Sequence, residues 1–288
     1  MMGRVAYVNG RYVRHAEAAV HIEDRGYQLA DAVYEVWALF GGKLADAEGH
    51  FARLERSLGE LSIAMPMSRT ALTMVLKEAV RRNRISEGSV YLQISRGVAP
   101  RDHAFPNPPV RPAVVVTVSR VDRAASEARA AKGVAVVTTP ENRWGRCDIK
   151  TVGLLPNALA KQKARAAGAV EAWFVDDLGF VTEGASSNAW IVDGDGRLRT
   201  RDTNANILRG VTRLTLLDVI RNAGLEVDER PFTPADAVAA KEAFITGAGS
   251  LVLPVVAVDG KPVGDGKVGP LAARLRRLYI EQAKAAAV

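Results

Sequence analysis

The 288-residue chain has little of several features on which whole classes of protein depend. Its single cysteine, Cys147, excludes an internal disulfide and any metal site built from several cysteines. No apolar run reaches the roughly 18 residues that a membrane-spanning helix needs. The N-terminal residues contain no apolar stretch typical of a secretory signal. These absences predict a cytoplasmic protein with no membrane segment and no metal ion.

Acidic residues are the scarcer of the two charged kinds. Thirty-nine Lys and Arg against 32 Asp and Glu give a net charge of +7, which favours anionic partners. Such partners include a nucleic acid, a membrane surface, or small molecules that carry phosphate or carboxylate. Only 6% of the residues are aromatic, and none is interleaved with the basic clusters at 81–84 and 274–277. Nucleic-acid binding normally involves bases stacked on aromatic side chains. We therefore interpret the two basic clusters as solvated helix faces and not as a nucleic-acid surface.

The first part of the chain predicts a small α+β domain over residues 1–120. Asn9-Gly10 and Gly41-Gly42 each lie between two β-type runs and predict hairpins. Helical spacing of apolar residues follows over 47–63 and again from 68 to 83. Two further strands are expected on either side of a proline-rich loop, VAPRDHAFPNPPVRP.

The second part predicts a larger domain over residues 133–288. Residues 121–132 are polar and rich in alanine, and we interpret them as a linker. Beyond them, four short β-type runs include a hairpin that turns near Asp177–Gly179. Helices are expected near 154–167, 211–223 and 270–286.

A glycine pattern near the end of the chain resembles a dinucleotide-binding fingerprint. GDGKVG at 264–269 matches G-x-G-x-x-G and precedes a helix. The sequence ends after that helix, so no second strand completes the βαβ unit on which nucleotide binding depends. The pattern therefore predicts a loop-to-helix joint.

Lys150 is an unusual lysine because an apolar helix follows it closely. A lysine that faces the interior loses hydration, and its neutral amine becomes available for Schiff-base chemistry. Glu183 opens a Gly/Ser-rich loop further on, and Gly210, Val211 and Thr212 stand at the start of a helix. Free N–H groups at a helix start can bind phosphate. An imine-forming lysine, a carboxylate and a phosphate site are the parts that pyridoxal phosphate requires.

Six motifs in order resemble those of the class IV, or fold-type IV, pyridoxal-phosphate aminotransferases, and most closely the D-amino acid aminotransferases. The motifs are EDRGYQLADAVYEV (23–36), HFARL (50–54), RGVAPRDHAFP (96–106), RWGRCDIKTVGLL (143–155), VTEGASSN (181–188) and ILRGVTR (207–213). The resemblance runs almost from end to end. It implies a two-domain α+β fold with a small N-terminal domain and a larger, α/β barrel-like C-terminal domain.

The resemblance also implies roles for single residues. Lys150 matches the lysine that forms the aldimine with pyridoxal 5'-phosphate and then moves the proton between the substrate Cα and the cofactor C4′. Glu183 matches the carboxylate that keeps the pyridine nitrogen protonated, so that the ring acts as an electron sink. Arg53 matches the phosphate-binding arginine. The other expected cofactor contacts are Ser187, Leu208, Val211, Thr212 and the backbone of Ala248.

Tyr34, Arg101 and His103 match the site for the substrate α-carboxylate. The expected reaction moves an amino group between a D-amino acid, of the D-alanine or D-glutamate type, and a 2-oxo acid. In the family the loop that carries Arg101 and His103 reaches the neighbouring subunit's active site, which implies a homodimer.

The sequence departs from the family pattern before Tyr34. Ala30-Asp31-Ala32 replaces Gly-Asp-Gly, so a turn that needs positive φ must differ if either glycine held one. Ala248 replaces a family threonine and offers the phosphate only its backbone N–H. Trp37 and Ala38 stand where other side chains usually line the substrate pocket.

Other functions remain open at this point. Within the same fold they are a branched-chain L-amino acid aminotransferase, an (R)-selective amine transaminase and aminodeoxychorismate lyase. The Arg101-x-His103 pair favours the D-amino acid subgroup. From a different class, a binding module without catalysis is disfavoured because Lys150, Glu183 and Arg53 are all present.

Overall fold

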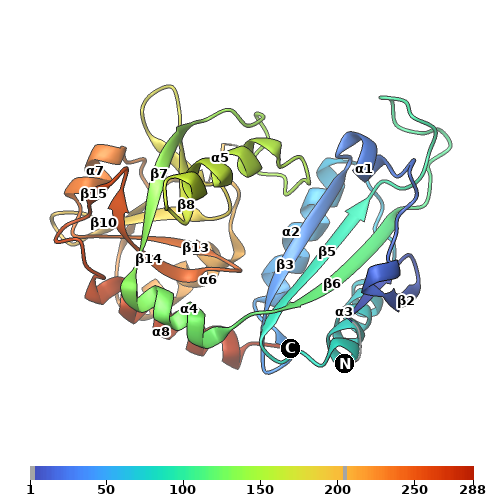
Figure 1. Cartoon of the computed structure of the whole chain (residues 1–288), viewed down its shortest axis with the longest axis horizontal. Coiled ribbons are helices and arrows are strands. Elements are labelled where there is room, and N and C mark those ends of the chain that lie inside the picture. The colour runs from blue at the N-terminus through green and yellow to red at the C-terminus, as the bar shows by residue number, and fades with distance from the viewer. Residues whose placement is uncertain (1–3, 204–205) are drawn as a thin grey trace. The chain divides into compact units, whose positions relative to one another are not determined.

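A computed structural model describes residues 4–203 and 206–288 of the chain (Figure 1). The described chain divides into two compact units. The first unit contains residues 1–122, 149–153 and 286–288, and the second contains residues 123–148 and 154–285. Each unit has its own sheet and its own hydrophobic core.

In the described part of the first unit, six strands form one antiparallel sheet in the order β2-β1-β6-β5-β3-β4. The strands are β1 (Val5–Val8), β2 (Arg11–Arg14), β3 (Ala32–Phe40), β4 (Lys43–Leu44), β5 (Gly88–Ser95) and β6 (Ala113–Arg120). The helical segments are η1 (His15–Glu17), α1 (Arg25–Leu29), α2 (Ala47–Glu60) and α3 (Arg69–Asn83).

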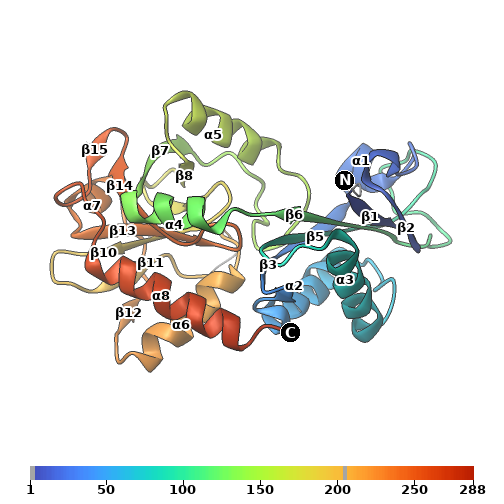
Figure 2. The ribbon, with the colours of Figure 1, turned by 60° about the horizontal axis from the view of Figure 1, so that its bottom comes forward.

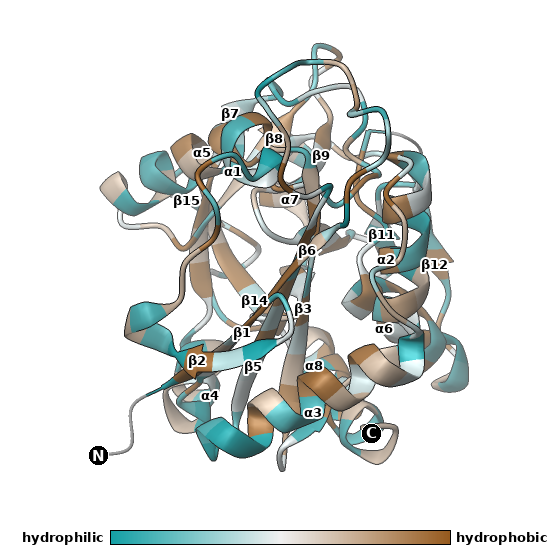
Figure 3. Ribbon diagram, turned by 90° about the vertical axis from the view of Figure 1, so that its right-hand side faces the viewer, coloured by the Kyte–Doolittle hydropathy of each residue, from teal (hydrophilic) through white to brown (hydrophobic). Residues whose placement is uncertain are grey.

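Helices α2 and α3 cover one face of this sheet (Figure 2). Phe51, Leu54 and Leu58 repeat at helical spacing on α2 and lie in the same core as Leu92 and Val116 of the sheet. Figure 3 shows the mainly hydrophobic residues of β6 and the mixed faces of α3. Burial of one helix stripe against the sheet therefore builds this unit, as the periodicity of the sequence predicts.

In the described part of the second unit, nine strands form a mixed sheet with the main order β12-β11-β10-β13-β14-β7-β8-β9, and β15 pairs with β14. The strands are β7 (Val134–Pro140), β8 (Glu171–Val175), β9 (Val181–Gly184), β10 (Asn188–Val192), β11 (Leu198–Thr200), β12 (Val227–Asp228), β13 (Glu242–Gly247), β14 (Leu251–Val258) and β15 (Lys261–Pro262). Strand β7 is parallel to β8 and to β14.

The helices of the second unit are α4 (Arg123–Lys132), α5 (Leu155–Ala166), α6 (Val211–Asn222), α7 (Pro234–Ala239) and α8 (Pro270–Ala285). Helices α6 and α8 lie side by side and contact β13, whereas α5 packs on β7 and β8 (Figure 2). The sheet is thus covered by helices that sequence periodicity predicts near 154–167, 211–223 and 270–286.

The hairpins at Asn9-Gly10 and Gly41-Gly42 are confirmed. Asn9 and Gly10 both have positive φ, and Val8 pairs with Arg11 on the two sides of the turn. Gly41 and Gly42 likewise have positive φ between β3 and β4. Such turns match the twist of antiparallel strands, and glycine and asparagine adopt them at low cost.

Two segments differ from the expectation. Residues 121–132, which we interpret as a linker from the sequence, contain the helix α4 at Arg123–Lys132. Their alanines have the highest helix propensity, and Ala130 is buried in the core of the second unit. Residues 149–153, which the sequence places in the second domain, belong to the first unit.

No helix within residues 4–203 and 206–288 is both long and apolar enough to span a bilayer. The same residues contain no cluster of three or more His, Cys, Asp or Glu side chains suited to hold a metal ion.

Candidate active site

Lys150 is held against the start of β3. Tyr34 N donates to Lys150 O at 3.0 Å, and Thr151 forms a bridge with Val33. Lys150 N donates to Ser57 Oγ on α2 at 3.4 Å. The lysine side chain is half-buried, and its Nζ lies 4.2 Å from the centre of the Tyr34 ring. The five-residue segment 149–153 therefore brings two predicted site residues together within one unit.

Tyr34 is one of two stacked tyrosines. Its ring lies 5.6 Å from that of Tyr91 on β5, at an interplanar angle of 29°. Tyr91 donates its hydroxyl to Gln93 Oε1 at 2.8 Å, and burial raises the pKa of Tyr91 to about 12. Sequence analysis missed Tyr91 and Gln93, although their i, i+2 spacing places them on one face of a strand.

Arg53 is oriented by a buried carboxylate that sequence analysis also missed. Arg53 Nε donates to Glu35 Oε1 at 2.8 Å, and Arg53 Nη2 donates to Glu35 Oε2 at 2.8 Å. His50 Nδ1 lies 2.7 Å from Glu35 Oε2. Burial alone would raise the pKa of Glu35, but Arg53 and His50 lower it to about 2. Burial lowers the pKa of His50, with Glu35 opposing the shift. The two-point contact fixes the plane of the Arg53 guanidinium.

Glu183 lies in the second unit, at the end of β9, and is 4% exposed. Its carboxylate accepts from Arg143 Nη1 at 2.5 Å, from Asn188 Nδ2 at 3.0 Å and from Leu208 N at 3.1 Å. Arg143 also binds Glu141, with Nη2 to Oε2 at 2.6 Å. A buried carboxylate is stable only when its oxygens have such donors. Glu183 is thus held as an oriented negative charge.

Asn188 connects the carboxylate to the start of α6. Its Nδ2 donates to Leu208 O at 3.0 Å as well as to Glu183. A Cβ at Gly210 would lie 2.0 Å from Asn188 Oδ1, so only glycine fits at this position. Helix α6 then begins at Val211.

The start of α6 offers backbone donors next to a hydroxyl. Gly210 is the N-cap and has no side chain with which to cap the first turn. Val211 and Thr212 are both buried. The unpaired N–H groups and the positive end of the helix dipole make such a start suitable for phosphate.

Ser187 and Ala248 lie on two neighbouring turns of the second unit. A Cβ at Gly247 would lie 3.1 Å from Ser186 O, which shows how close the turns are. Ser187 Oγ donates to Glu171 Oε2 at 2.9 Å, and Ser186 Oγ donates to the same oxygen at 2.7 Å. The role of Ser187 and Ala248 as cofactor contacts stays a prediction.

Arg101 and His103 lie on the loop between β5 and β6, and both side chains are exposed. The predicted residues therefore fall into two groups. Those in the first unit are Tyr34, Arg53, Arg101, His103 and Lys150. Those in the second unit are Glu183, Ser187, Leu208, Val211, Thr212 and Ala248.

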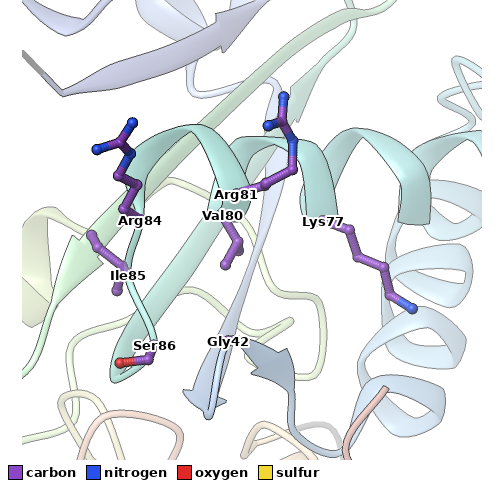
Figure 4. A pocket seen from close by; sticks show the side chains of 7 residues that line it. All are labelled: Gly42, Lys77, Val80, Arg81, Arg84, Ile85 and Ser86. Atoms are coloured by element: carbon purple, nitrogen blue, oxygen red, sulfur yellow. The ribbon is translucent and has the colours of Figure 1, made fainter. Parts of the chain in front are cut away.

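A separate surface hollow of about 310 Å³ lies beside the C-terminal end of α3 (Figure 4). Its lining residues are Gly42, Lys77, Val80, Arg81, Arg84, Ile85 and Ser86. Arg81 Nε donates to Glu78 Oε2 at 2.6 Å, as expected for a solvated helix face. The hollow contains none of the predicted site residues.

The GDGKVG pattern is a loop-to-helix joint, as the sequence predicts. Glu242 accepts from Leu271 N at 3.0 Å and from Ala272 N at 2.8 Å, so this carboxylate caps the start of α8. A Cβ at Gly269 would lie 1.9 Å from the Glu242 side chain. The glycine therefore makes room for the Glu242 carboxylate at the start of α8.

Cys147 is a buried thiol beside Arg143 in the second unit. Its Sγ donates to Trp144 O at 3.2 Å. Burial raises the pKa of Cys147 to about 11, which keeps the thiol protonated at neutral pH. Because the thiolate is the nucleophile, this shift disfavours Cys147 as a nucleophile.

Comparison with known proteins defines the class of the chain. The model of the family described as amino-transferase class IV matches residues 32–258. A D-alanine aminotransferase of Bacillus licheniformis is 39% identical over 263 residues, which cover 91% of each chain. A D-alanine aminotransferase of Staphylococcus aureus (strain COL) is 38% identical over 96% of this chain and 97% of its own. The chain belongs to the class IV aminotransferases.

Solved structures agree on the fold. The T.th. branched-chain amino acid aminotransferase with pyridoxamine 5'-phosphate has a TM-score of 0.88 and 27% identity, over 98% of this chain and 94% of its own. The Escherichia coli branched-chain enzyme has a TM-score of 0.88 at 23% identity, with the same coverage of 98% and 94%. The two-domain α+β fold expected from the motifs is confirmed.

Proposed function

We propose that this class IV aminotransferase uses pyridoxal 5'-phosphate to move an amino group between a D-amino acid and a 2-oxo acid. The observation that carries the proposal is the position of Lys150. Its carbonyl accepts a hydrogen bond from Tyr34 N on β3, and its Nζ lies 4.2 Å from the centre of the Tyr34 ring. The near full-length identity of 39% to a D-alanine aminotransferase supports the choice of substrate.

The residues present fit this cofactor. Glu183 supplies an oriented anion for a protonated pyridine nitrogen, and the start of α6 supplies backbone donors for phosphate. Leu208 is tied to the same assembly because its N and O atoms bind Glu183 and Asn188. The family resemblance assigns Arg53 to phosphate binding, and its guanidinium is oriented by Glu35. When bound, the cofactor supplies a ring that withdraws electrons from the substrate Cα.

Lys150 has two tasks in this proposal. Its amine would hold the cofactor in the resting enzyme, and it would take the proton from the substrate Cα and later give that proton back. The bonds from Tyr34 N and to Ser57 Oγ fix the main chain of Lys150, which limits where Nζ can move. A base held on one side of a plane removes a proton from that side alone, which selects one stereochemistry.

Glu183 keeps a negative charge at the pyridine nitrogen. Arg143, Asn188 and Leu208 N hold its carboxylate in one orientation. Such preorganised electrostatics lower the free energy of the charge that develops during proton removal.

Tyr34, Arg101 and His103 bind the substrate α-carboxylate. The guanidinium of Arg101 offers paired donors that match a carboxylate, and His103 and Tyr34 add hydrogen bonds. We expect a homodimer in which the Arg101 loop serves the active site of the neighbouring subunit. The cytoplasmic location stays a prediction.

A second candidate is a branched-chain L-amino acid aminotransferase, favoured by the T.th. structure with its TM-score of 0.88. The deciding experiment follows the visible absorbance of the purified, cofactor-loaded enzyme on addition of single D- and L-amino acids, without an acceptor. We expect D-alanine and D-glutamate to remove the absorbance quickly and L-leucine to leave it unchanged. A faster reaction with L-leucine would refute the D-amino acid assignment. A reaction with (R)-amines, or with aminodeoxychorismate alone, would point to the other members of the fold.

A further inference from the structure

The loop that carries Arg101 and His103 is exposed, yet its main-chain carbonyls accept hydrogen bonds from a buried arginine, Arg25. Arg25 Nη1 donates to Asp102 O at 2.6 Å, and Arg25 Nη2 donates to His103 O at 3.4 Å. The Arg25 side chain is only 3% exposed. The buried guanidinium of Arg25 thus binds the backbone carbonyls of Asp102, which lies between the two predicted recognition residues, and of His103 itself.

Arg96 holds the same loop at a second point. Its guanidinium carbon lies 3.5 Å from the centre of the Phe105 ring. Its Nη2 donates to Leu61 O at 2.7 Å, and its Nη1 donates to Ser62 O at 3.1 Å. These carbonyls directly follow α2, so Arg96 fixes the loop relative to that helix.

Asp31 joins the two arginines. Its Oδ2 accepts from Arg25 Nε at 2.8 Å and from Arg96 Nε at 2.7 Å, and its Oδ1 accepts from Arg96 Nη2 at 3.0 Å. The main chain repeats the connection, because Arg96 N donates to Asp31 O at 3.0 Å. One carboxylate therefore pairs with both buried guanidinium groups, each of which would be costly to bury without a partner.

We propose that Arg25, Asp31 and Arg96 are positioning residues for recognition of the substrate α-carboxylate. They order the loop before substrate arrives, so that Arg101 and His103 present their donors in one arrangement. A preordered loop spares binding the entropy cost of fixing it. The inference rests on the proposed function, in which Arg101 and His103 bind that carboxylate.

Arg25→Lys tests the proposal, because lysine keeps the charge beside Asp31 but cannot also reach the two loop carbonyls. We expect KM for D-alanine to rise by about tenfold, since small misplacements of binding groups are costly. The kcat and the visible absorbance of the loaded enzyme should stay near wild type. Arg201→Lys is the matched control, because Arg201 is also buried and pairs with a carboxylate, Asp176, at 2.7 Å.

A double-mutant cycle separates positioning from a purely structural role. If Arg25 acts through Arg101, then Arg25→Lys should raise KM by less than about twofold in an Arg101→Ala background. The positioning role would be overturned if the two substitutions raised KM independently, so that their fold-changes multiplied in the double variant. It would also be overturned if the Arg25→Lys enzyme had the wild-type KM. An Arg101→Ala enzyme with wild-type KM would instead overturn the proposed carboxylate site itself.

Phe105→Leu decides the matter if Arg25→Lys does not fold. Phe105 is 57% exposed, so its replacement leaves the core intact while it removes the ring beneath Arg96. We expect a severalfold rise in KM for D-alanine that disappears in the Arg101→Ala background. An unchanged KM in the wild-type background would refute the inference.

Discussion

Replacement of Ala30 by glycine should stabilise the folded chain. Ala30 ends α1 in the left-handed conformation, with φ 56° and ψ 21°. That conformation costs an L-residue about 1–2 kcal/mol, which glycine avoids. The greater conformational entropy of the unfolded chain with glycine lowers the free energy of unfolding by roughly 0.5–1 kcal/mol. The net expected gain in the free energy of unfolding is between zero and about 1.5 kcal/mol.

Ala32→Gly provides the matched control two residues later. Ala32 begins β3 in extended pairing with Ser95, and its side chain is fully buried. The Ala32→Gly variant loses a buried methyl group, and its unfolded chain has more conformational entropy. Its free energy of unfolding should therefore be lower by about 1–2 kcal/mol. The two substitutions restore the two family glycines one at a time and should have opposite signs.

The assay is urea unfolding of the cofactor-loaded enzyme, followed by fluorescence at fixed protein and cofactor concentration. The midpoint should rise for Ala30→Gly and fall for Ala32→Gly, at an unchanged slope. Because the turn keeps its conformation in the first variant, KM for D-alanine should stay the same. A lower midpoint for Ala30→Gly would show that φ at this position does not limit stability.

Four further predictions concern the site. Lys150→Ala should lower kcat on the order of 10³-fold or more, because the variant loses both the amine that holds the cofactor and the group that moves the proton. Lys77→Ala is the control and should leave kcat unchanged. Steady-state rates measure both effects. Glu183→Gln should lower kcat more than it raises KM, and unchanged kcat would contradict the electrostatic role. Mixed dimers of Arg101→Ala and Lys150→Ala subunits should regain activity, because one site then has both residues; inactive mixed dimers would exclude a shared site. Ionised Glu35 should stabilise the fold above pH about 4.5 and lose that effect as pH falls toward its pKa of about 2, so Glu35→Gln should flatten the stability profile in this range.

Local patterns in the sequence predicted elements well where geometry depends on neighbouring residues. The Asn9-Gly10 hairpin and the helix that begins at Val211 follow from turn chemistry and periodicity. The polar, alanine-rich composition of 121–132 predicts a linker, whereas the structure has a helix over Arg123–Lys132, because alanine has high helix propensity even where hydrophobicity is low. Its burial against β14 comes from residues more than a hundred positions away.

The candidate site shows the same division. Motifs indicated Lys150, Glu183 and Arg53, but they did not reveal the residues that orient them. Glu35 is a carboxylate within the mainly apolar strand β3, and no local pattern shows that Arg53 and His50 lie beside it. Arg143 likewise reaches Glu183 across 40 positions of sequence. Such partners are set by tertiary packing, so only the structure identifies them.

The placement of residues 149–153 has a consequence for synthesis. The first unit needs these residues beside Val33 and Tyr34, and it also needs Val288, whose N and O atoms both bond to Leu44. Strands β1 to β6 are translated before both segments: residue 149 follows the end of β6 at Arg120 by 29 positions, and Val288 follows the second unit. The unit translated first therefore contains residues that are translated after the second unit, and Leu44 lacks its Val288 partner until then. Slowed translation near residue 150 should lengthen the lifetime of this incomplete unit, and with it the demand for chaperones.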